Sequence, residues 1–392
     1  MKLKNYFNLN GISQNKKYLI GFSGGPDSTF LFFHTLNLVG KENIVAAHVN
    51  YHLRDEADEA QKLVEQYCKE NDVTLFVQEV VNDTNENVEG WARKVRYEFF
   101  NHIAAKEKCD AVVIAHTFDD DIETYALQKE RSNIVTYFGL KESTYWKDLN
   151  VIRPMLTLKK QEVLNWIEDN NLTVDFDKTN EDDKYRRNFI RKHLDHETVE
   201  LYIREKNSRN RMMQWVYEKL NKIIQPEFTL ETFLPLNDKE ELVFIYEYIK
   251  RFVPNYNLDK MKKNIAGEIA KQLRSDKAYI CIKINEKYAL IKDRGNVFLK
   301  PTAVLNRTFQ ITKAADLKEL SLFANYDEIQ IIFEQHGAIT VSNDFQQYQA
   351  KLTYRGKKAS EFYLKNKISY RFRIENAVAF IEGDCEILTK IR

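Results

Sequence analysis

The chain has 392 residues, which is too long for one small hydrophobic core, so we expect two or three domains. Its composition, 43% hydrophobic and 30% charged, is ordinary for a soluble globular protein. No stretch approaches the roughly 20 apolar residues of a membrane span, and the Met1–Tyr6 segment lacks the apolar core of a signal peptide. The net charge of +1 does not indicate a nucleic-acid partner, so any basic surface must be local.

The four cysteines are far apart in the sequence and form no C-x-x-C pair: Cys68, Cys109, Cys281 and Cys385. This spacing excludes an obvious zinc or iron–sulfur site. It indicates free thiols in a reducing compartment, and we expect a cytoplasmic protein.

The first half of the chain alternates apolar runs with helical patterns. The apolar runs predict strands at 18–22, 43–50, 74–80, 111–115 and 150–153. The helical patterns lie between them, at 29–36, 54–70, 87–108, 118–131 and 158–170. This alternation predicts an α/β domain with a doubly wound parallel sheet, whose ligands bind beyond the carboxyl ends of the strands.

The second half has a different pattern. Residues 196–252 are predicted to be helical, and residues 279–284 and 287–291 to form a hairpin. From about residue 304 the pattern is mixed, with strands expected near 329–333, 338–341 and 377–381. We therefore divide the chain into three domains, 1–195, 196–300 and 301–392.

The stretch Ser23-Gly24-Gly25-Pro26-Asp27-Ser28, here called the phosphate loop, joins the first strand to the first helix. Two glycines let backbone N–H groups approach an anion, and Pro26 suits the first helical turn. The hydroxyls of Ser23 and Ser28 and the positive helix N-terminus also favour a phosphate. The loop contains no lysine and lacks the Walker spacing, so it is not a conventional NTPase loop.

Further candidates follow the second strand and open the third helix. His48 and Asn50 end a strand, where an adenine or ribose could rest, although polar residues there could simply cap a helix. Arg93, Arg96 and Tyr97 share one helical face. The two guanidinium groups could bind phosphate oxygens, or could belong to a solvated charged face.

An acidic cluster follows the fourth strand and His116. It comprises Asp119, Asp120, Asp121 and Glu123. Carboxylates beside a phosphate loop suggest Mg²⁺, or a cationic substrate, and some acids are expected only to favour the helix N-terminus. Further along, Asp177–Arg191 turns from acidic to basic, and phosphates of a nucleic acid or of ATP could meet Arg186, Arg187 and Arg191.

The phosphate loop resembles the signature of the PP-loop ATP pyrophosphatase superfamily. Taken together, the stretches above resemble the tRNA(Ile)-lysidine synthetase family over about the first half of the chain, with Arg153-Pro154-Met155-Leu156 and the Tyr-x-Arg-Asn-x-x-Arg core ending at Arg191. The far end, from Leu352 to Gly383, looks like a worn version of the family's small C-terminal domain.

The resemblance implies a two-step reaction on the cytidine at the first anticodon position of an isoleucine tRNA with a CAU anticodon. ATP adenylates the C2 oxygen, and the ε-amino group of free lysine then displaces AMP to give lysidine. The modified base pairs with adenosine, so codon and amino-acid identity change together. The oligomeric state stays open, with a homodimer as one candidate.

The resemblance also implies roles for the candidate residues. The pyrophosphate and nucleotide would be held by Ser23, Gly24, Gly25, Pro26, Asp27, Ser28, His48 and Asn50. Mg²⁺ would be held by Asp27 with Asp120 or Asp119, and the lysine cation by Glu123 with a neighbouring Asp. The expected catalytic group is Asp27, Arg93, Arg96, His116, Asp119, Asp120 and Glu123. tRNA contacts are expected in the two C-terminal domains and at Arg186, Arg187, Arg191, Arg355, Lys357 and Lys358.

This chain departs from the family pattern at three places: Asp121 replaces Gln, Arg131-Ser132-Asn133 replaces Gly-Ser-Gly, and Tyr354-Arg355-Gly356 shortens a Pro-Gly-rich segment. Three alternatives stay open. A tRNA thiolase would need a persulfide or cluster cysteine, and an amidotransferase would need a glutaminase domain. A non-enzymatic RNA-binding protein would leave the phosphate loop unexplained.

Overall fold

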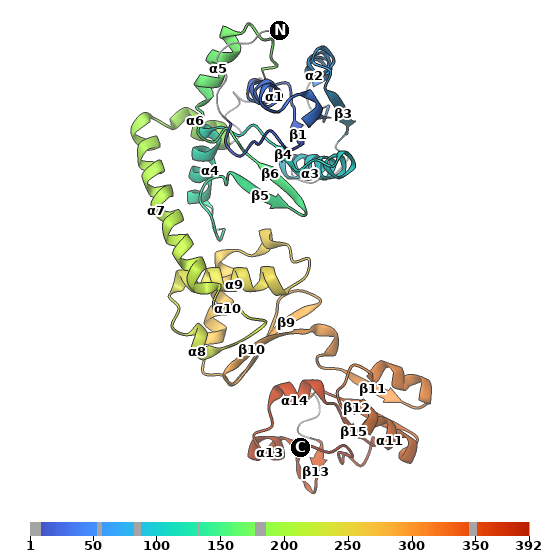
Figure 1. Cartoon of the computed structure of the whole chain (residues 1–392). Helices are drawn as coiled ribbons and strands as arrows, with labels where there is room; N and C mark the ends of the chain where they lie inside the picture. Colours follow the sequence, from blue (N-terminus) through green and yellow to red (C-terminus); the bar gives the residue numbers. More distant parts are fainter. Residues whose placement is uncertain are drawn as a thin grey trace. The chain divides into compact units, whose positions relative to one another are not determined.

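The computed structural model describes residues 9–52, 57–81, 88–131, 133–176, 186–344 and 351–391. The chain forms two compact units, which Figure 1 colours from blue to red along the sequence. Unit 1 comprises Met1–Arg131 with Val135–Met213, and unit 2 comprises Ser132–Ile134 with Gln214–Arg392. Among the described helices, none combines the length and apolar character that a bilayer crossing demands.

Unit 1 is built on a six-stranded sheet with the strand order β3-β2-β1-β4-β6-β5. Five strands are parallel, and β5 pairs antiparallel with β6 at one edge. The strands are β1 (Tyr18–Gly21), β2 (Ile44–Asn50), β3 (Thr74–Glu79), β4 (Ala111–Val113), β5 (Ser143–Trp146) and β6 (Leu149–Ile152). The predicted parallel α/β sheet is confirmed.

Helices cover both faces of this sheet, as a doubly wound fold requires. Along β1, Tyr18 and Ile20 enter one hydrophobic core while Leu19 enters the other, because strand side chains alternate between faces. The first core includes side chains of α1 (Pro26–Val39), α2 (Ala57–Glu70) and α5 (Lys160–Asp169), and the second those of α3 (Val88–Glu107). Helix α1 is apolar on most sides because it lies within the first core.

Each strand and helix predicted for unit 1 is present, with shifted ends. Helix α1 begins three residues earlier than its apolar run, at Pro26, so half of the phosphate loop is helical. The starts predicted at 54 and 87 lie outside the described residues. The sequence prediction missed β5, a short edge strand joined to β6 by a turn in which Lys147 has a φ of 53°. The remaining helices of this unit are α4 (Phe118–Glu130), α6 (Arg186–His193) and most of α7 (His196–Leu220).

Unit 2 contains a four-stranded antiparallel sheet ordered β7-β10-β9-β8. Its strands are β7 (Glu227–Thr229), β8 (Tyr279–Lys283), β9 (Tyr288–Asp293) and β10 (Asn296–Pro301), and its helices are α8 (Leu230–Phe233), α9 (Asp238–Phe252) and α10 (Lys263–Arg274). The predicted hairpin is β8–β9. The continuous helical expectation for 196–252 is wrong between α7 and α9, where β7 pairs with β10.

The last part of unit 2 is a small mixed α/β region. It contains β11 (Thr308–Ile311), α11 (Tyr326–His336), β12 (Ile339–Ser342), β13 (Thr353–Tyr354), β14 (Lys357–Lys358), α13 (Ala359–Lys365), α14 (Tyr370–Glu375) and β15 (Val378–Phe380). The strand predicted near 329–333 is wrong, because these residues belong to α11. Ile329 and Ile332 are buried while Ile331 is 53% exposed, which is helical spacing.

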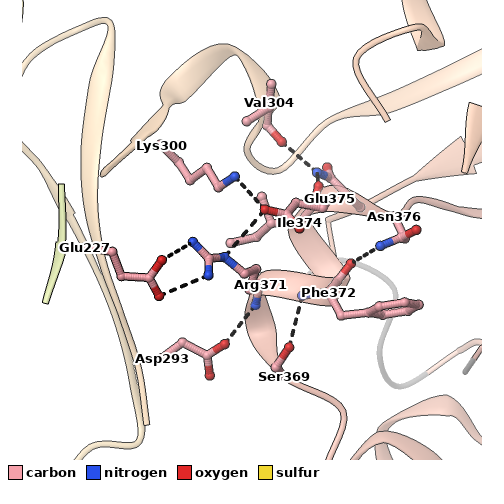
Figure 2. Close-up of polar contacts among 11 residues, drawn as sticks. Glu227, Asp293, Lys300, Val304, Ser369, Arg371, Phe372, Ile374, Glu375 and Asn376 are labelled. Atoms are coloured by element: carbon pink, nitrogen blue, oxygen red, sulfur yellow. Dashed lines mark hydrogen bonds and ion pairs between the residues drawn. The ribbon is translucent and has the colours of Figure 1, made fainter. Parts of the chain in front are cut away.

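Helix α14 is attached to the β7–β10 sheet by charged contacts, which Figure 2 shows, and by one aromatic contact. Arg371 donates from both terminal nitrogens to Glu227, at 3.0 and 2.7 Å, and its backbone N–H donates to Asp293. Tyr370 stacks on Tyr279 with ring centroids 3.7 Å apart. These contacts hold α14 against the sheet within unit 2.

Candidate active site at the carboxyl edge of the parallel sheet

The candidate residues meet where the strand order of unit 1 reverses. From β1 the chain moves outward to β2 and β3, and then returns to place β4 on the other side of β1. The phosphate loop follows β1 and the acidic start of α4 follows β4, so both lie at the same edge of the sheet. This is the position where open α/β sheets bind ligands.

The phosphate loop is a tight turn held by its own hydroxyl groups. The oxygen of Ser28 accepts from the backbone N–H of Ser23 at 3.2 Å and lies 3.0 Å from the Ser23 hydroxyl. Gly24 has a φ of +88°, and a Cβ there would lie 3.2 Å from the carbonyl oxygen of Ala60. Gly25 is the N-cap of α1 and offers no side chain to the first helical amides. Those amides therefore face a site that suits an anion.

Asp27 in the first turn of α1 is the most perturbed acid of the site. Its pKa is raised to about 6, first by burial and also by the nearby charges of Asp120 and Asp119, against the lowering effect of Lys160 and Arg191. Among the described residues, no group donates a hydrogen bond to its buried Oδ1. Its other oxygen lies 3.8 Å from the Lys160 ammonium. A buried carboxylate with an unsatisfied oxygen favours the arrival of a cation.

Two acids of the cluster cap helices. Asp120 accepts from the backbone N–H and the hydroxyl of Thr117, at 2.8 and 3.0 Å, and completes a capping box at the start of α4. Asp119 accepts from the backbone N–H of Lys160 at 2.7 Å, at the first residue of α5. The expectation that some acids favour a helix N-terminus therefore describes contacts of both residues. Asp120 caps its own helix, α4, whereas Asp119 caps α5.

The other two acids are buried and paired with cations. Asp121 pairs with Lys206 of α7 and accepts from the backbone N–H of Leu140 at 2.6 Å. Glu123, which is 1% exposed, accepts from Nε and Nη2 of Arg191 at 2.6 and 3.2 Å. Asp121, which replaces the family's Gln, therefore anchors the loop that follows α4.

His116 lies among three arginines. Its pKa is lowered to about 3, first by burial and then by Arg153, Arg96 and Arg93, against a raising effect of Asp120. Arg93 and Arg96 lie 4.6 and 6.0 Å from the ring centre of Tyr97. Within the described part of the chain, no carboxylate pairs with any of the three guanidinium groups. This cluster suits an anionic ligand and keeps His116 neutral at physiological pH.

His48 and Asn50 are buried beside the phosphate loop and hold its surroundings together. The Nδ1 atom of His48 lies 2.9 Å from the carbonyl oxygen of Phe22, which directly precedes the loop. Asn50 donates to Asp58 and Gln61 of α2 and accepts from the backbone N–H of His52. Their proposed contact with the nucleotide stays a prediction.

The predicted tRNA-binding residues are distributed over both units. Arg186 and Arg187 begin α6, but their side chains, like all of 177–185, lie outside the described residues. Arg191 is engaged by Glu123. Lys357 and Lys358 are exposed on β14, and the preceding turn has positive φ at Arg355 (53°) and Gly356 (73°), which is typical of a type I′ hairpin.

Three residues of the site were missed as site residues by the sequence prediction: Lys160 beside Asp27, Lys206 beside Asp121, and Arg153 beside His116. Arg153 is buried and donates to the carbonyl oxygen of Lys141 and the hydroxyl of Thr144. Lys160 lies in the first turn of the helix predicted at 158–170, which follows the last parallel strand, and this position was the available signal. Lys206 lies within a charged helix and gave none.

The protein side chains alone do not form a complete metal cage. Across the described residues, no three His, Cys, Asp or Glu side chains converge as metal ligands. Mg²⁺ commonly binds one or two carboxylates together with substrate phosphates and water. The unsatisfied Oδ1 of Asp27, a residue of the phosphate loop, fits that mode of binding.

The chain is similar to known proteins over almost its whole length. Residues 1–198 match the family model of the PP-loop domain. The chain is 34% identical to the tRNA(Ile)-lysidine synthase of Mycoplasma mycoides subsp. mycoides SC, over 97% of this chain and 98% of that protein. It is 31% identical to the tRNA(Ile)-lysidine synthase of Mesoplasma florum, over 96% of this chain and 97% of that protein.

Among solved structures, the U34-tRNA thiolase NcsA of Methanococcus maripaludis aligns with a TM-score of 0.41 and 17% identity, over 51% of this chain and 72% of that chain. A likeness at this level carries no argument about the reaction. The nearly full-length matches to the two synthases, together with the phosphate loop and the acids at the start of α4, decide the family. The chain belongs to the tRNA(Ile)-lysidine synthase family, with a PP-loop domain at its N-terminus.

Proposed function

We propose that this chain uses ATP to join free lysine to C2 of the first-anticodon-position cytidine in an isoleucine tRNA with a CAU anticodon. As a member of its family, it is a ligase that forms lysidine on tRNA(Ile) with ATP. The observation that carries the proposal is the placement of Asp27 and the phosphate loop beside the acids of α4, at the strand-order reversal.

In the first step, the C2 oxygen of cytidine attacks the α-phosphorus of ATP, and pyrophosphate leaves. The amides at the start of α1 and the Ser23 and Ser28 hydroxyls would bind the β- and γ-phosphates. Asp27, with Asp120 or Asp119, would hold Mg²⁺, which offsets negative charge on the leaving group when it is bound. His48 and Asn50 would support the nucleotide side of the loop.

Arg93 and Arg96 would bind a phosphate or the activated base. Both guanidinium groups lie near His116 and have no carboxylate partner among the described residues, so an anion would relieve their mutual repulsion. His116 is neutral at the working pH and can accept or donate a hydrogen bond without adding another positive charge.

In the second step, the ε-ammonium group of lysine loses a proton and its nitrogen attacks C2. The bond from C2 to the adenylated oxygen breaks, AMP leaves, and the nitrogen releases a second proton and keeps one hydrogen. Glu123 with a neighbouring Asp would attract the lysine cation. In this structure Arg191 already pairs with Glu123, so binding through Glu123 would require the lysine to share or displace that guanidinium. Glu123 and the neighbouring Asp would also accept the proton that the ε-ammonium group loses.

We assign tRNA recognition to basic residues of α6 and of the C-terminal hairpin. We divide the chain into a catalytic domain (1–195), a helical and hairpin domain (196–300) and a C-terminal domain (301–392). Arg186, Arg187 and the exposed hairpin cations Arg355, Lys357 and Lys358 would contact tRNA phosphates. A reducing cytoplasm suits the four unpaired thiols. A homodimer is a separate prediction, which light scattering of the purified protein tests.

The state of the cysteines favours a ligase over a tRNA thiolase. Burial raises the pKa of Cys68 to about 12 and that of Cys109 to about 11, so neither thiol is readily ionised near neutral pH. Thiolation by a cysteine persulfide needs an accessible, reactive sulfur. The two cysteines of unit 1 therefore do not supply the chemistry that the alternative requires.

The proposal is tested by incubating the protein with ATP, MgCl₂, radiolabelled lysine and tRNA transcripts. Label is expected in isoleucine tRNA with the CAU anticodon, and not in methionine tRNA with the same anticodon. Omission of ATP and the variant Asp27→Ala are the controls, and both should abolish labelling. If the tRNA instead acquires sulfur from cysteine and no lysine, the chain is a tRNA thiolase and the proposal is wrong.

A further inference from the structure

The phosphate loop itself supplies no cation. Residues 23–28 contain neither lysine nor arginine, although the triphosphate of ATP carries several negative charges. Backbone amides and hydroxyls provide hydrogen bonds but only partial charge. A cation from elsewhere in the chain would add a full positive charge near the loop, in addition to any bound Mg²⁺.

Lys160 is placed to provide it. Its Nζ lies 3.8 Å from Oδ2 of Asp27, which is itself a loop residue 133 positions earlier in the chain. This separation is too long for a hydrogen bond, so the ion pair is loose. The Lys160 side chain is 31% exposed and the Asp27 side chain 23%, so the ammonium retains access to the solvent side of the loop.

The backbone of Lys160 is fixed by a short hydrogen bond, whereas its ammonium group has only the loose ion pair with Asp27 among the described residues. Asp119 accepts a hydrogen bond from the Lys160 N–H at 2.7 Å, and the N–H of Phe118 donates to the carbonyl oxygen of Leu158 at 2.9 Å. These bonds fix the first turn of α5 against the start of α4. The ammonium group, in contrast, has Asp27 as its partner within the described part of the chain.

The other cations near Asp27 are engaged or more distant. Arg191 is bound by both oxygens of Glu123. Arg93, Arg96 and Arg153 act electrostatically on His116, whereas the cations that act on Asp27 are Lys160 and Arg191. Of these cations, Lys160 alone forms an ion pair with a loop residue in the described structure.

We infer that Lys160 is the phosphate-binding cation of this PP-loop: its ammonium pairs with Asp27 in the nucleotide-free protein and moves to the β- or γ-phosphate when ATP binds, which leaves Asp27 available to a metal ion. Asp119 is the positioning residue that fixes the start of α5. The inference rests on the proposed ATP-dependent function and names a residue for it. Because the β- and γ-phosphates leave as pyrophosphate, the same contact would stabilise the leaving group.

The test is direct binding of pyrophosphate and of AMP to the full-length protein in MgCl₂, by calorimetry, with no tRNA or lysine present. Lys160→Ala is expected to weaken pyrophosphate binding about 10- to 100-fold, the usual loss for a charge-assisted hydrogen bond. AMP binding should stay within about twofold, because AMP lacks the β- and γ-phosphates. Lys160→Arg keeps the charge and should retain most of the pyrophosphate affinity.

Lys159→Ala is the matched control, since Lys159 is the exposed neighbour of Lys160 and its ammonium group forms no ion pair with a described acid. Its contact with Glu162 is made by the backbone N–H, which the substitution keeps. It should bind both probes like the parent protein. The inference is overturned if Lys160→Ala binds pyrophosphate normally, or if it loses AMP and pyrophosphate affinity equally, which would indicate a disturbed fold. A third outcome separates this inference from the proposed function. If the parent protein binds pyrophosphate, Lys160→Ala loses that binding, and the parent transfers no lysine to tRNA, then Lys160 is the phosphate-binding cation but the proposed function is wrong.

Discussion

Arg191 of α6 grips Glu123 of α4 with two hydrogen bonds, at 2.6 and 3.2 Å, and the carboxylate is almost completely buried. Burial alone would lower the pKa of Arg191, but its hydrogen bonds and charge interaction with Glu123 outweigh that effect and raise it. Two residues that the sequence assigned to different tasks, lysine binding and tRNA binding, are therefore one ion pair in this structure.

Replacing Arg191 by Met should destabilise unit 1, because a buried carboxylate would lose its partner. Such a loss typically costs about 3 to 5 kcal/mol, which denaturant unfolding would resolve. Arg211→Met, at an exposed position on α7, is the control and should change stability little. The opposite result would be an Arg191→Met variant of unchanged stability whose tRNA affinity depends less steeply on salt, by about one unit of slope. Arg191 would then contact a tRNA phosphate, as the sequence predicted.

Replacing Asp27 by Asn should stabilise the nucleotide-free protein while it abolishes AMP formation. The folded pKa of Asp27 is about 6 and its ordinary value is 3.8, so ionising it costs stability as pH rises through this window. Above pH 7 the Asn variant should gain up to about 3 kcal/mol in unfolding free energy, and at pH 4 the gain should largely vanish.

Asp169→Asn, an exposed change on α5, is the control for the Asp27 variant and should show no such pH-dependent gain. If Asp27→Asn is no more stable than the parent at pH 7.5, the buried carboxylate is already satisfied. Its proposed role as a metal ligand would then lose its structural support.

The core histidine His34 should make the protein less stable in mild acid. His34 stacks on Phe30 with ring centroids 3.8 Å apart, and burial lowers its pKa to about 4 from 6.5. Below pH 6.5 His34 is protonated in the unfolded chain but stays neutral in the folded chain. The free energy of unfolding therefore falls as pH drops from 6.5 toward 4. Unfolding measured between pH 7.5 and 5 should show a shallower decline for His34→Gln.

His102→Gln is the matched control for His34, because His102 is exposed on α3. It should leave the pH dependence of unfolding unchanged. A decline of equal steepness in the parent protein and in His34→Gln would show that His34 does not contribute to acid sensitivity.

The cations of the C-terminal region should separate into two kinds. Changing the exposed Lys357 and Lys358 to Ala should weaken tRNA binding and reduce its salt dependence by about two units, with little change in stability. Arg371→Ala should instead cost about 1 kcal/mol in stability, because Arg371 binds Glu227 (Figure 2). Arg371 also lies 4.2 Å from the Phe298 ring centre. Filter binding at several salt concentrations and thermal unfolding measure the two effects.

The opposite pattern, in which Arg371→Ala lowers the salt dependence and the double lysine variant does not, would place the RNA surface on α14. Either result distinguishes an internal contact from an external one. The sequence alone could not do so, because both sets of cations lie in the same short, basic and aromatic stretch.

The central part of unit 1 was predictable because its signals are local. Buried β1, the glycines of the phosphate loop and Pro26 at the start of α1 are consecutive in sequence, and alternating strands and helices left few topologies. The edge strand β5 was missed because it is four residues long and half exposed. The strand prediction at Ile329–Phe333 is wrong because a short apolar run is compatible with either a strand or a buried helix segment.

The pairing of site residues was less predictable than their presence. The acids of α4 were found because they follow a strand, but their individual partners come from other elements: α5 for Asp119, α7 for Asp121 and α6 for Glu123. Such pairings depend on where separate elements meet, and no spacing within one sequence encodes them. The ion pair of Lys160 with Asp27 was unpredictable for the same reason, although the place of Lys160 after the last parallel strand was a signal for a site residue.

The most direct test of the account is the fate of α-labelled ATP given to the purified protein with tRNA(Ile) bearing the CAU anticodon. The account predicts AMP and pyrophosphate when lysine is present, and an adenylated tRNA that accumulates when lysine is omitted. Asp27→Ala should yield neither product. Cleavage to ADP and phosphate, or no tRNA-dependent turnover of ATP, would contradict the claim that this sheet edge activates a nucleobase.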